Sequence, residues 1–328
     1  MMSPDPAVLI TGATGGLGRR TALELARRGR SVVVGGRRRD AVEGLCSEIA
    51  QLGVEATPFV ADLASLGDVR RALDDLGDLP LHGVVANAGI NTTRDQRSVD
   101  GYELTFAVNV LSHQLLLCRL AGQLVDQARV VIVASGVHLP ENKLARRCGI
   151  PAPRWVGARS LAMPDEAPAE RRLDNGRQRY STSKLANVLQ ARGLQQRLRQ
   201  LEKTADVFAI DPGLMVDTDL ARELPAALRG VLRAVGRLAT PFVDNMRLSP
   251  IAAGHVAALV EEPGWRGKGF GYLDGDLVVP PSKDAQRDEL MEELWHDSVA
   301  LTGLQQEETC LPLGESARPS DFRLASSS

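Results

Sequence analysis

The sequence predicts one doubly wound α/β domain, in which helices cover both faces of a single parallel sheet. Short apolar segments alternate with segments of helical spacing through the first half of the chain. A glycine-rich turn follows the first apolar segment and opens the first helix, with the sequence Thr11-Gly12-Ala13-Thr14-Gly15-Gly16-Leu17-Gly18. The connections are short, which suits right-handed crossovers between neighbouring parallel strands.

Hydrophobic periodicity places the elements of the first half. Residues 7–10 form the first strand, and Gly29 ends the helix after the glycine turn. Asp40 and Glu43 suggest a capping box at the start of the next helix. Further strands are expected at 31–34, 57–61, 83–86 and 129–134, and further helices at 40–52, 65–76 and within 101–125. Strands as apolar as these are buried on both faces.

The second half departs from this regular alternation. Residues 139–179 contain five prolines and little periodicity, and they predict an insertion before a long helix at 180–201. A sixth strand at 207–210, helices at 223–238 and 250–260, and a last strand at 269–273 are expected to follow. We expect residues 1–302 to form one domain and the polar residues 303–328 to form a flexible tail.

Composition excludes several classes of function. The net charge of −2 argues against a general affinity for nucleic acid or anionic membranes. The four cysteines are scattered and no histidine cluster accompanies them, so neither a metal site nor a disulfide framework is expected. No run of ~18 apolar residues occurs, and no stable membrane insertion is expected. We expect a cytoplasmic protein with a small-molecule substrate, and homo-oligomerisation stays open.

The glycine turn predicts a dinucleotide site. Gly12, Gly16 and Gly18 lie between a strand and a helix, where free backbone N–H groups and the helix dipole bind a pyrophosphate. The alternative is that these glycines only make a tight turn. The next strand runs into Arg37, Arg38 and Arg39 with no earlier carboxylate, and a guanidinium suits the 2′-phosphate of NADP. NADP is therefore expected rather than NAD.

Among these arginines, Arg37 is the first candidate for the 2′-phosphate by position, and Arg19 is a weaker one. For Arg38 and Arg39 the alternative is that they coat a solvated loop.

Tyr180 and Lys184 predict an acid/base site. They lie four positions apart on an expected helix, so both side chains project from one face. A buried ammonium stabilises phenolate, and we expect Lys184 to bring the pKa of the phenol from near 10 toward neutral.

Together, the turn Gly-x-x-x-Gly-x-Gly after Thr11 and the motif Tyr180-x-x-Ser-Lys-Leu-Ala-Asn resemble the short-chain dehydrogenase/reductase (SDR) family. Within it, the second motif is closest to the retinol dehydrogenase and protochlorophyllide reductase branch. The resemblance covers residues 7–273 and implies a Rossmann-type fold. It also implies a catalytic tetrad of Asn109, Ser135, Tyr180 and Lys184, in which Asn109 holds a relay water against the lysine.

The resemblance also implies where the cofactor lies. Asn87-Ala88-Gly89 would form a cofactor wall, Asp62 would face the adenine, and Pro212-Gly213 would lie beside the nicotinamide. Thr218 would bind the carboxamide, although it lies one residue further along than is usual. The full set of expected contacts is Thr11, Gly12, Thr14, Gly16, Leu17, Gly18, Arg37, Asp62, Leu63, Asn87, Ala88, Gly89, Tyr180, Lys184, Pro212, Gly213 and Thr218.

These inferences predict an NADP(H)-dependent oxidoreductase, a ketone or aldehyde reductase or alcohol dehydrogenase, with Tyr180 as general acid/base. The apolar stretch 216–248 indicates a lid over a pocket for a bulky apolar substrate, with a permanently packed helix as the alternative. A C=C reductase or an epimerase would use the same proton donor, and a non-catalytic nucleotide sensor stays open. His113, His138 and His255 are expected to be structural or to contact substrate.

Overall fold

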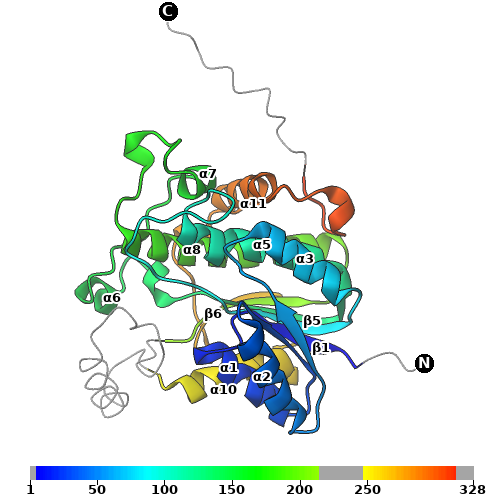
Figure 1. Cartoon of the computed structure of the whole chain (residues 1–328). Coiled ribbons are helices and arrows are strands. Elements are labelled where there is room, and N and C mark those ends of the chain that lie inside the picture. Colours follow the sequence, from blue (N-terminus) through cyan, green and yellow to red (C-terminus); the bar gives the residue numbers. More distant parts are fainter. Residues whose placement is uncertain (1–4, 214–246, 315–328) are drawn as a thin grey trace, which may run out of the picture.

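A computed structural model describes residues 5–213 and 247–314 of the chain (Figure 1). In this part the strands form one eight-stranded sheet in the order β3-β2-β1-β4-β5-β6-β7-β8. The first seven strands are parallel, and β8 pairs antiparallel with β7. Their bounds are β1 Ala7–Ile10, β2 Val32–Gly36, β3 Ala56–Val60, β4 Leu81–Ala86, β5 Leu124–Val133, β6 Asp206–Asp211, β7 Phe270–Asp274 and β8 Leu277–Val278. The predicted doubly wound parallel sheet is confirmed.

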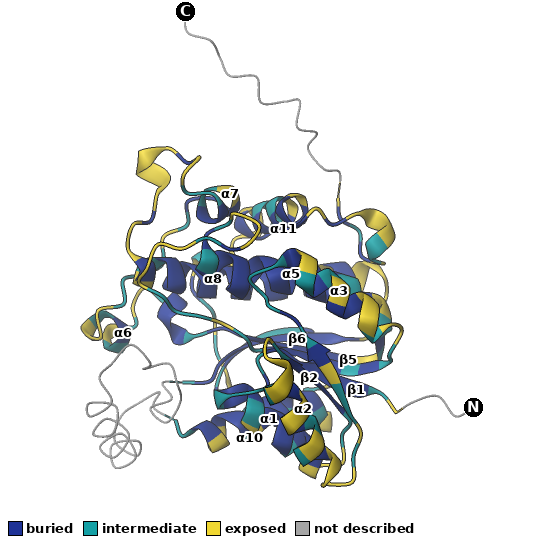
Figure 2. Cartoon of the chain, in the orientation of Figure 1, coloured by how far each residue is buried: buried dark blue, intermediate teal, exposed yellow. Residues whose placement is uncertain are grey.

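Helices cover both faces of the sheet. Figure 1 shows α1 (Gly16–Arg27), α2 (Arg39–Ala50) and α10 (Ser249–Glu261) on one face. The other face carries α3 (Leu66–Leu76), α5 (Ser112–Leu120), α8 (Gly176–Gln200) and α11 (Asp288–Thr302). Each face has its own apolar core, because the strand side chains point alternately to the two sides. Figure 2 shows α8 buried along most of its length, under α11.

The long central helix has an irregular middle. It begins as α4 (Leu104–Phe106), widens into a π-helical turn at Ala107–Leu111, and continues as α5 and a 3₁₀ turn at Ala121–Gln123. Leu104–Gln123 is the one described helix long and apolar enough to cross a membrane, and 89% of its apolar window is buried inside the protein. It serves here as a core helix.

Several sequence expectations need correction. α2 begins at Arg39 with Arg38 at its N-cap and no side-chain cap, so the capping box expected from Asp40 and Glu43 does not form. The strand β8 and the helix α11 were not predicted. The expected flexible tail starts too early, because Leu304, Leu311 and Leu313 are buried in the core.

The insertion 139–179 contains short elements: α6 (Lys143–Arg147), α7 (Ala158–Ala162) and a 3₁₀ turn at Ala169–Arg171. It ends earlier than expected, because α8 starts at Gly176. The side chain of Asn175 caps this start by accepting hydrogen bonds from the Arg177 and Gln178 amides. The predicted lid at 216–248 lies outside the described residues except for its last two positions, and Thr218 lies outside them as well.

Candidate active site

Most of the described residues expected to bind the cofactor follow the carboxyl ends of β1 to β6, whereas Tyr180 and Lys184 lie on α8. This edge is where open α/β sheets bind their ligands. β1 leads into the glycine turn, β4 ends at Asn87-Ala88-Gly89, and β5 ends just before Ser135. The doubly wound order therefore brings together motifs that are far apart in the sequence.

Close backbone contacts shape the glycine turn. A Cβ at Gly18 would lie 2.4 Å from the carbonyl oxygen of Gly12 and 2.5 Å from Nδ2 of Asn87, whereas a Cβ at Gly15 would meet nothing within 4 Å. Gly12 and Gly16 adopt left-handed φ angles of 65° and 52°.

The start of α1 fits a bound pyrophosphate. Within the described residues it has neither a side-chain cap nor an acidic residue in its first turn. Its free N–H groups therefore suit an anion. Leu17 is buried in the first turn of α1. Thr14 lies close to the end of β2, because a Cβ at Gly36 would come within 2.8 Å of the Thr14 methyl group.

Thr11 joins the turn to the end of β4. Its hydroxyl oxygen accepts hydrogen bonds from the backbone amides of Asn87 and Ala88, each at 3.0 Å, and Asn87 Nδ2 donates to Thr11 O at 2.8 Å. The two lone pairs of this oxygen are used by the two amides. The Thr11 hydroxyl therefore donates its proton to Nε2 of His113, at 2.9 Å. Asn87 and His113 thus have structural contacts here.

Asn109 lies in the widened turn and ties three segments together. Its side chain accepts from the Ile90 amide at 2.8 Å and donates to Ile90 O and Ser183 Oγ, both at 3.0 Å. Its backbone carbonyl accepts from Nδ2 of Asn187 at 2.8 Å and from Nδ1 of His113 at 3.3 Å. Both lone pairs of this carbonyl are therefore used by side chains.

Asn187 then completes the connection to the lysine. Nζ of Lys184 donates to Asn187 Oδ1 at 3.1 Å and to Val133 O at 2.7 Å. Sequence analysis expected Asn109 to hold a relay water against the lysine, and that expectation stays a prediction. Lys184 keeps one further N–H, and a Cβ at Gly89 would lie 3.6 Å from Nζ. Glycine at 89 thus leaves space for a hydroxyl beside the ammonium.

Tyr180 and Lys184 share one buried site, but their pKa values differ from the expectation. Burial raises the pKa of Tyr180 to about 12; the Asp211 carboxylate adds to this rise, and a hydrogen bond with Ser135 opposes it. Burial lowers the pKa of Lys184 to about 8, against the opposing effect of Asp211.

The expected shift of the phenol toward neutral pH is therefore wrong for the protein alone. Nζ of Lys184 lies 5.9 Å from the centre of the Tyr180 ring, and burial, which penalises the charged phenolate, is the largest cause of the raised pKa. The phenol keeps its proton at neutral pH.

Ser135 is held by the turn that follows β5. Its side chain accepts from the Val137 amide at 3.4 Å. Nδ1 of His138 donates to Ser135 O at 2.8 Å, and Nε2 accepts from the Ser282 amide at 3.3 Å. Burial lowers the pKa of His138 to about 4, so the ring is neutral and its two nitrogens are both used. His138 is a structural contact between this turn and the segment after β8.

At the end of β2, Arg37 is the arginine without an acidic partner. The other three candidates form ion pairs: Arg19 with Glu48, Arg38 with Asp40 at 3.6 Å, and Arg39 with Glu43 at 3.4 Å. No hydrogen bond or ion pair of the Arg37 side chain occurs within the described residues, and this side chain is exposed. Arg37 is thus available to an anion beside the end of β2.

Asp62 and Leu63 occupy the neighbouring corner. The amide of Ala61 donates to Gly36 O at 3.0 Å, so the ends of β3 and β2 are adjacent. Oδ1 of Asp62 accepts from the Ala64 amide at 3.0 Å, and Leu63 packs against the core. After β6, Gly213 has a φ of 82° and donates to Asp211 Oδ1 at 3.0 Å, which forms the turn expected with Pro212.

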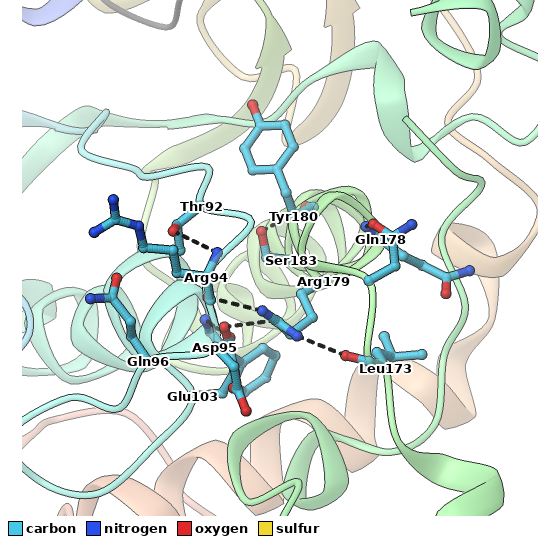
Figure 3. A network of polar contacts seen from close by, with 12 residues as sticks. Thr92, Arg94, Asp95, Gln96, Glu103, Leu173, Gln178, Arg179, Tyr180 and Ser183 are labelled. Carbon is cyan, nitrogen blue, oxygen red and sulfur yellow. Dashed lines mark hydrogen bonds and ion pairs between the residues drawn. The ribbon is translucent and has the colours of Figure 1, made fainter. Parts of the chain in front are cut away.

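Arg179 is a buried residue that sequence analysis missed. It donates to the carbonyls of Leu173 at 2.9 Å and Arg94 at 3.0 Å, and its Nε lies 3.1 Å from Glu103 Oε1. Figure 3 shows this network on one side of α8, with the Tyr180 ring pointing away from it. No periodic pattern marks such an arginine, although its position directly before Tyr180 was a clue.

Comparison with known proteins agrees with this geometry. Residues 6–144 match the family model described as short chain dehydrogenase. Polyprenol dehydrogenase of Mus musculus is 32% identical over 92% of this chain and 84% of its own length, and retinol dehydrogenase 14 of Homo sapiens is 32% identical over 90% and 86%. A short chain dehydrogenase from Burkholderia cenocepacia, solved in complex with NADP, superposes with a TM-score of 0.59 at 24% identity over 82% of this chain and 96% of its own.

The fold and site define a nicotinamide-dependent oxidoreductase. The chain belongs to the short-chain dehydrogenase/reductase family, and its relatives place it in the retinol dehydrogenase-like branch.

Proposed function

We propose that this protein is an NADP(H)-dependent carbonyl reductase or alcohol dehydrogenase in which Tyr180 is the general acid/base. The observation that carries the proposal is the grouping of a protonated Tyr180 phenol, the Ser135 hydroxyl and a Lys184 ammonium with a free N–H beside the glycine turn. Such a group supplies one mobile proton next to a hydroxyl that orients an oxygen atom.

Each side chain has a definite part in the proposed reaction. When bound, the reduced nicotinamide supplies hydride to the carbonyl carbon. Ser135 donates a hydrogen bond that orients the carbonyl oxygen, and Tyr180 gives that oxygen its proton. Lys184 donates its remaining N–H to a hydroxyl of the ribose. Because burial raises the pKa of Tyr180 to about 12, the phenol is protonated at neutral pH and holds the proton that the carbonyl oxygen receives.

NADP is proposed over NAD because of Arg37. It is the one candidate arginine whose charge is not already neutralised by a carboxylate in the described residues. A bidentate guanidinium bond to a 2′-phosphate would then set the preference.

The test is Tyr180→Phe, with NADPH oxidation measured against a panel of ketones, aldehydes and enones. We expect the variant to bind NADPH as the parent does but to lose about 10²–10⁴-fold in turnover, the range for general acid catalysis. Turnover within tenfold of the parent would show that another group delivers the proton. NADPH binding by the parent without oxidation of NADPH by any compound would instead favour the nucleotide sensor.

A further inference from the structure

Outside the residues already discussed, the first part of the insertion forms a compact loop beside Tyr180. We call residues 136–150 the cap loop. One side chain, Arg146 on α6, folds it onto itself: the guanidinium donates to Val137 O at 3.0 Å, Leu139 O at 2.8 Å and Pro140 O at 3.3 Å, and also to Ile150 O. Four carbonyls from both ends of the loop thus converge on a single cation.

Two further side chains hold the cap loop, one from within it and one from α8. Asn142 accepts from the Ala145 amide at 3.0 Å, which starts α6, and it donates to Gly136 O at 2.9 Å. Arg177, in the first turn of α8, donates to Gly149 O at 3.3 Å. The loop is therefore closed by Asn142 from within and bound by Arg177 to the helix that carries Tyr180.

The cap loop places apolar side chains against Tyr180. Val137, Ala145 and Tyr180 form a small buried cluster, separate from the two main cores, and Ile150 packs against it while remaining half-buried. Val137 lies two positions after Ser135, whose hydroxyl bonds the Tyr180 phenol. A carbonyl held by both hydroxyls would therefore place one of its substituents beside this cluster.

We propose that Ile150 determines the size of the apolar group accepted on the carbonyl carbon, with the cap loop as a fixed wall of the substrate pocket. The inference rests on the proposed function of Ser135 and Tyr180. The substrate class is a ketone with one apolar substituent that contacts Ile150, the partly buried residue of this cluster. Because Arg146 and Asn142 hold the loop, a change at position 150 alters the space and not the backbone.

The experiment compares Ile150→Ala and Ile150→Phe with the parent, using acetophenone, propiophenone and butyrophenone with NADPH. The matched control is Ile251→Ala, an exposed isoleucine on α10, on the opposite face of the sheet. We expect the ratio of kcat/KM for butyrophenone over acetophenone to rise about tenfold in Ile150→Ala, the order of effect for added methylene groups in a pocket, and to fall in Ile150→Phe. The control should keep the parent ratio.

Binding of the same ketones separates this inference from the proposed function. Quenching of bound NADPH fluorescence gives Kd for each ketone with little turnover when each protein also carries Tyr180→Phe. A size preference in Kd that follows residue 150, with no NADPH oxidation by the proteins that keep Tyr180, would support the wall and contradict the reductase. If the butyrophenone over acetophenone ratios of Kd and of kcat/KM stay at the parent value in both Ile150 variants, the proposal about Ile150 is wrong and the proposed reductase is unaffected. Absence of ketone binding to any of the proteins would overturn both.

Discussion

The turn between β1 and α1 and the loop between β5 and α8 border the same end of the sheet, but different bonds hold them. In the first, the backbone packs so closely that Gly18 has no room for a Cβ. In the loop between β5 and α8, arginine side chains hold the backbone. Arg146 and Arg179 donate to backbone carbonyls that accept no hydrogen bond within a strand or helix.

This difference explains why one region was easier to predict than the other. A backbone contact that excludes Cβ leaves glycine as its mark in the sequence. A guanidinium can donate to any backbone carbonyl within its reach. The residues that it joins therefore have no fixed spacing that could be recognised in the sequence. The glycine turn thus rests on backbone geometry that few sequences satisfy, whereas the loop between β5 and α8 can change its path by exchanging single side chains.

The largest effect is expected at Arg179. In Arg179→Met, Glu103 stays buried without its partner, and the carbonyls of Leu173 and Arg94 lose their donor. Breaking a buried pair in this way costs about 3–5 kcal/mol, which urea unfolding would measure. Arg172→Met is the control, because among the described residues this exposed arginine donates only to carbonyls within the insertion. If both variants lose the same free energy of unfolding, the ion pair with Glu103 does not stabilise the protein more than the exposed Arg172 contacts do.

An intermediate effect is expected at Arg37. Arg37→Ala should weaken NADPH binding by about 1.5–3 kcal/mol, the range for hydrogen bonds to charged groups, and leave NADH binding unchanged. Arg39→Ala is the control, because Arg39 already pairs with Glu43. Titration of both cofactors by fluorescence would decide. A loss of the same size for NADH would assign Arg37 to the shape of the loop instead of the phosphate.

The smallest effect is expected at the glycine turn. In Gly18→Ala the new methyl group would overlap the Gly12 carbonyl, and forcing it in should cost about 1–3 kcal/mol of stability and weaken either cofactor. Gly15→Ala adds the same methyl group where nothing lies within 4 Å, at a residue with an extended φ of −158°. If Gly18→Ala and Gly15→Ala lower the unfolding temperature equally, the close packing around Gly18 does not limit which residues the glycine turn accepts.

The sequence predicted much of the fold but less of the candidate site. The glycine turn and the parallel strands followed from periodicity and motif spacing, whereas the grouping of Ser135 with Tyr180 was implied by the resemblance to the SDR family. The helix α11 was missed although Leu290, Leu294 and Trp295 have helical spacing. The bridge through Asn187 was not predictable, because the widened turn that frees the Asn109 carbonyl has no signature in the sequence. The high pKa of Tyr180 depends on burial, which spacing alone does not give.

The hydrogen bonds from Thr11 through His113, Asn109 and Asn187 to Lys184 also have an evolutionary consequence. Each member uses its donors and acceptors on its neighbours, and replacing one alone would leave a buried polar group unpaired at a cost of about 1–3 kcal/mol. Neutral drift at a single position is therefore suppressed, and paired exchanges are the accessible route. Three separate chain segments are thus expected to diverge as one inherited block: the glycine turn, the central helix and α8.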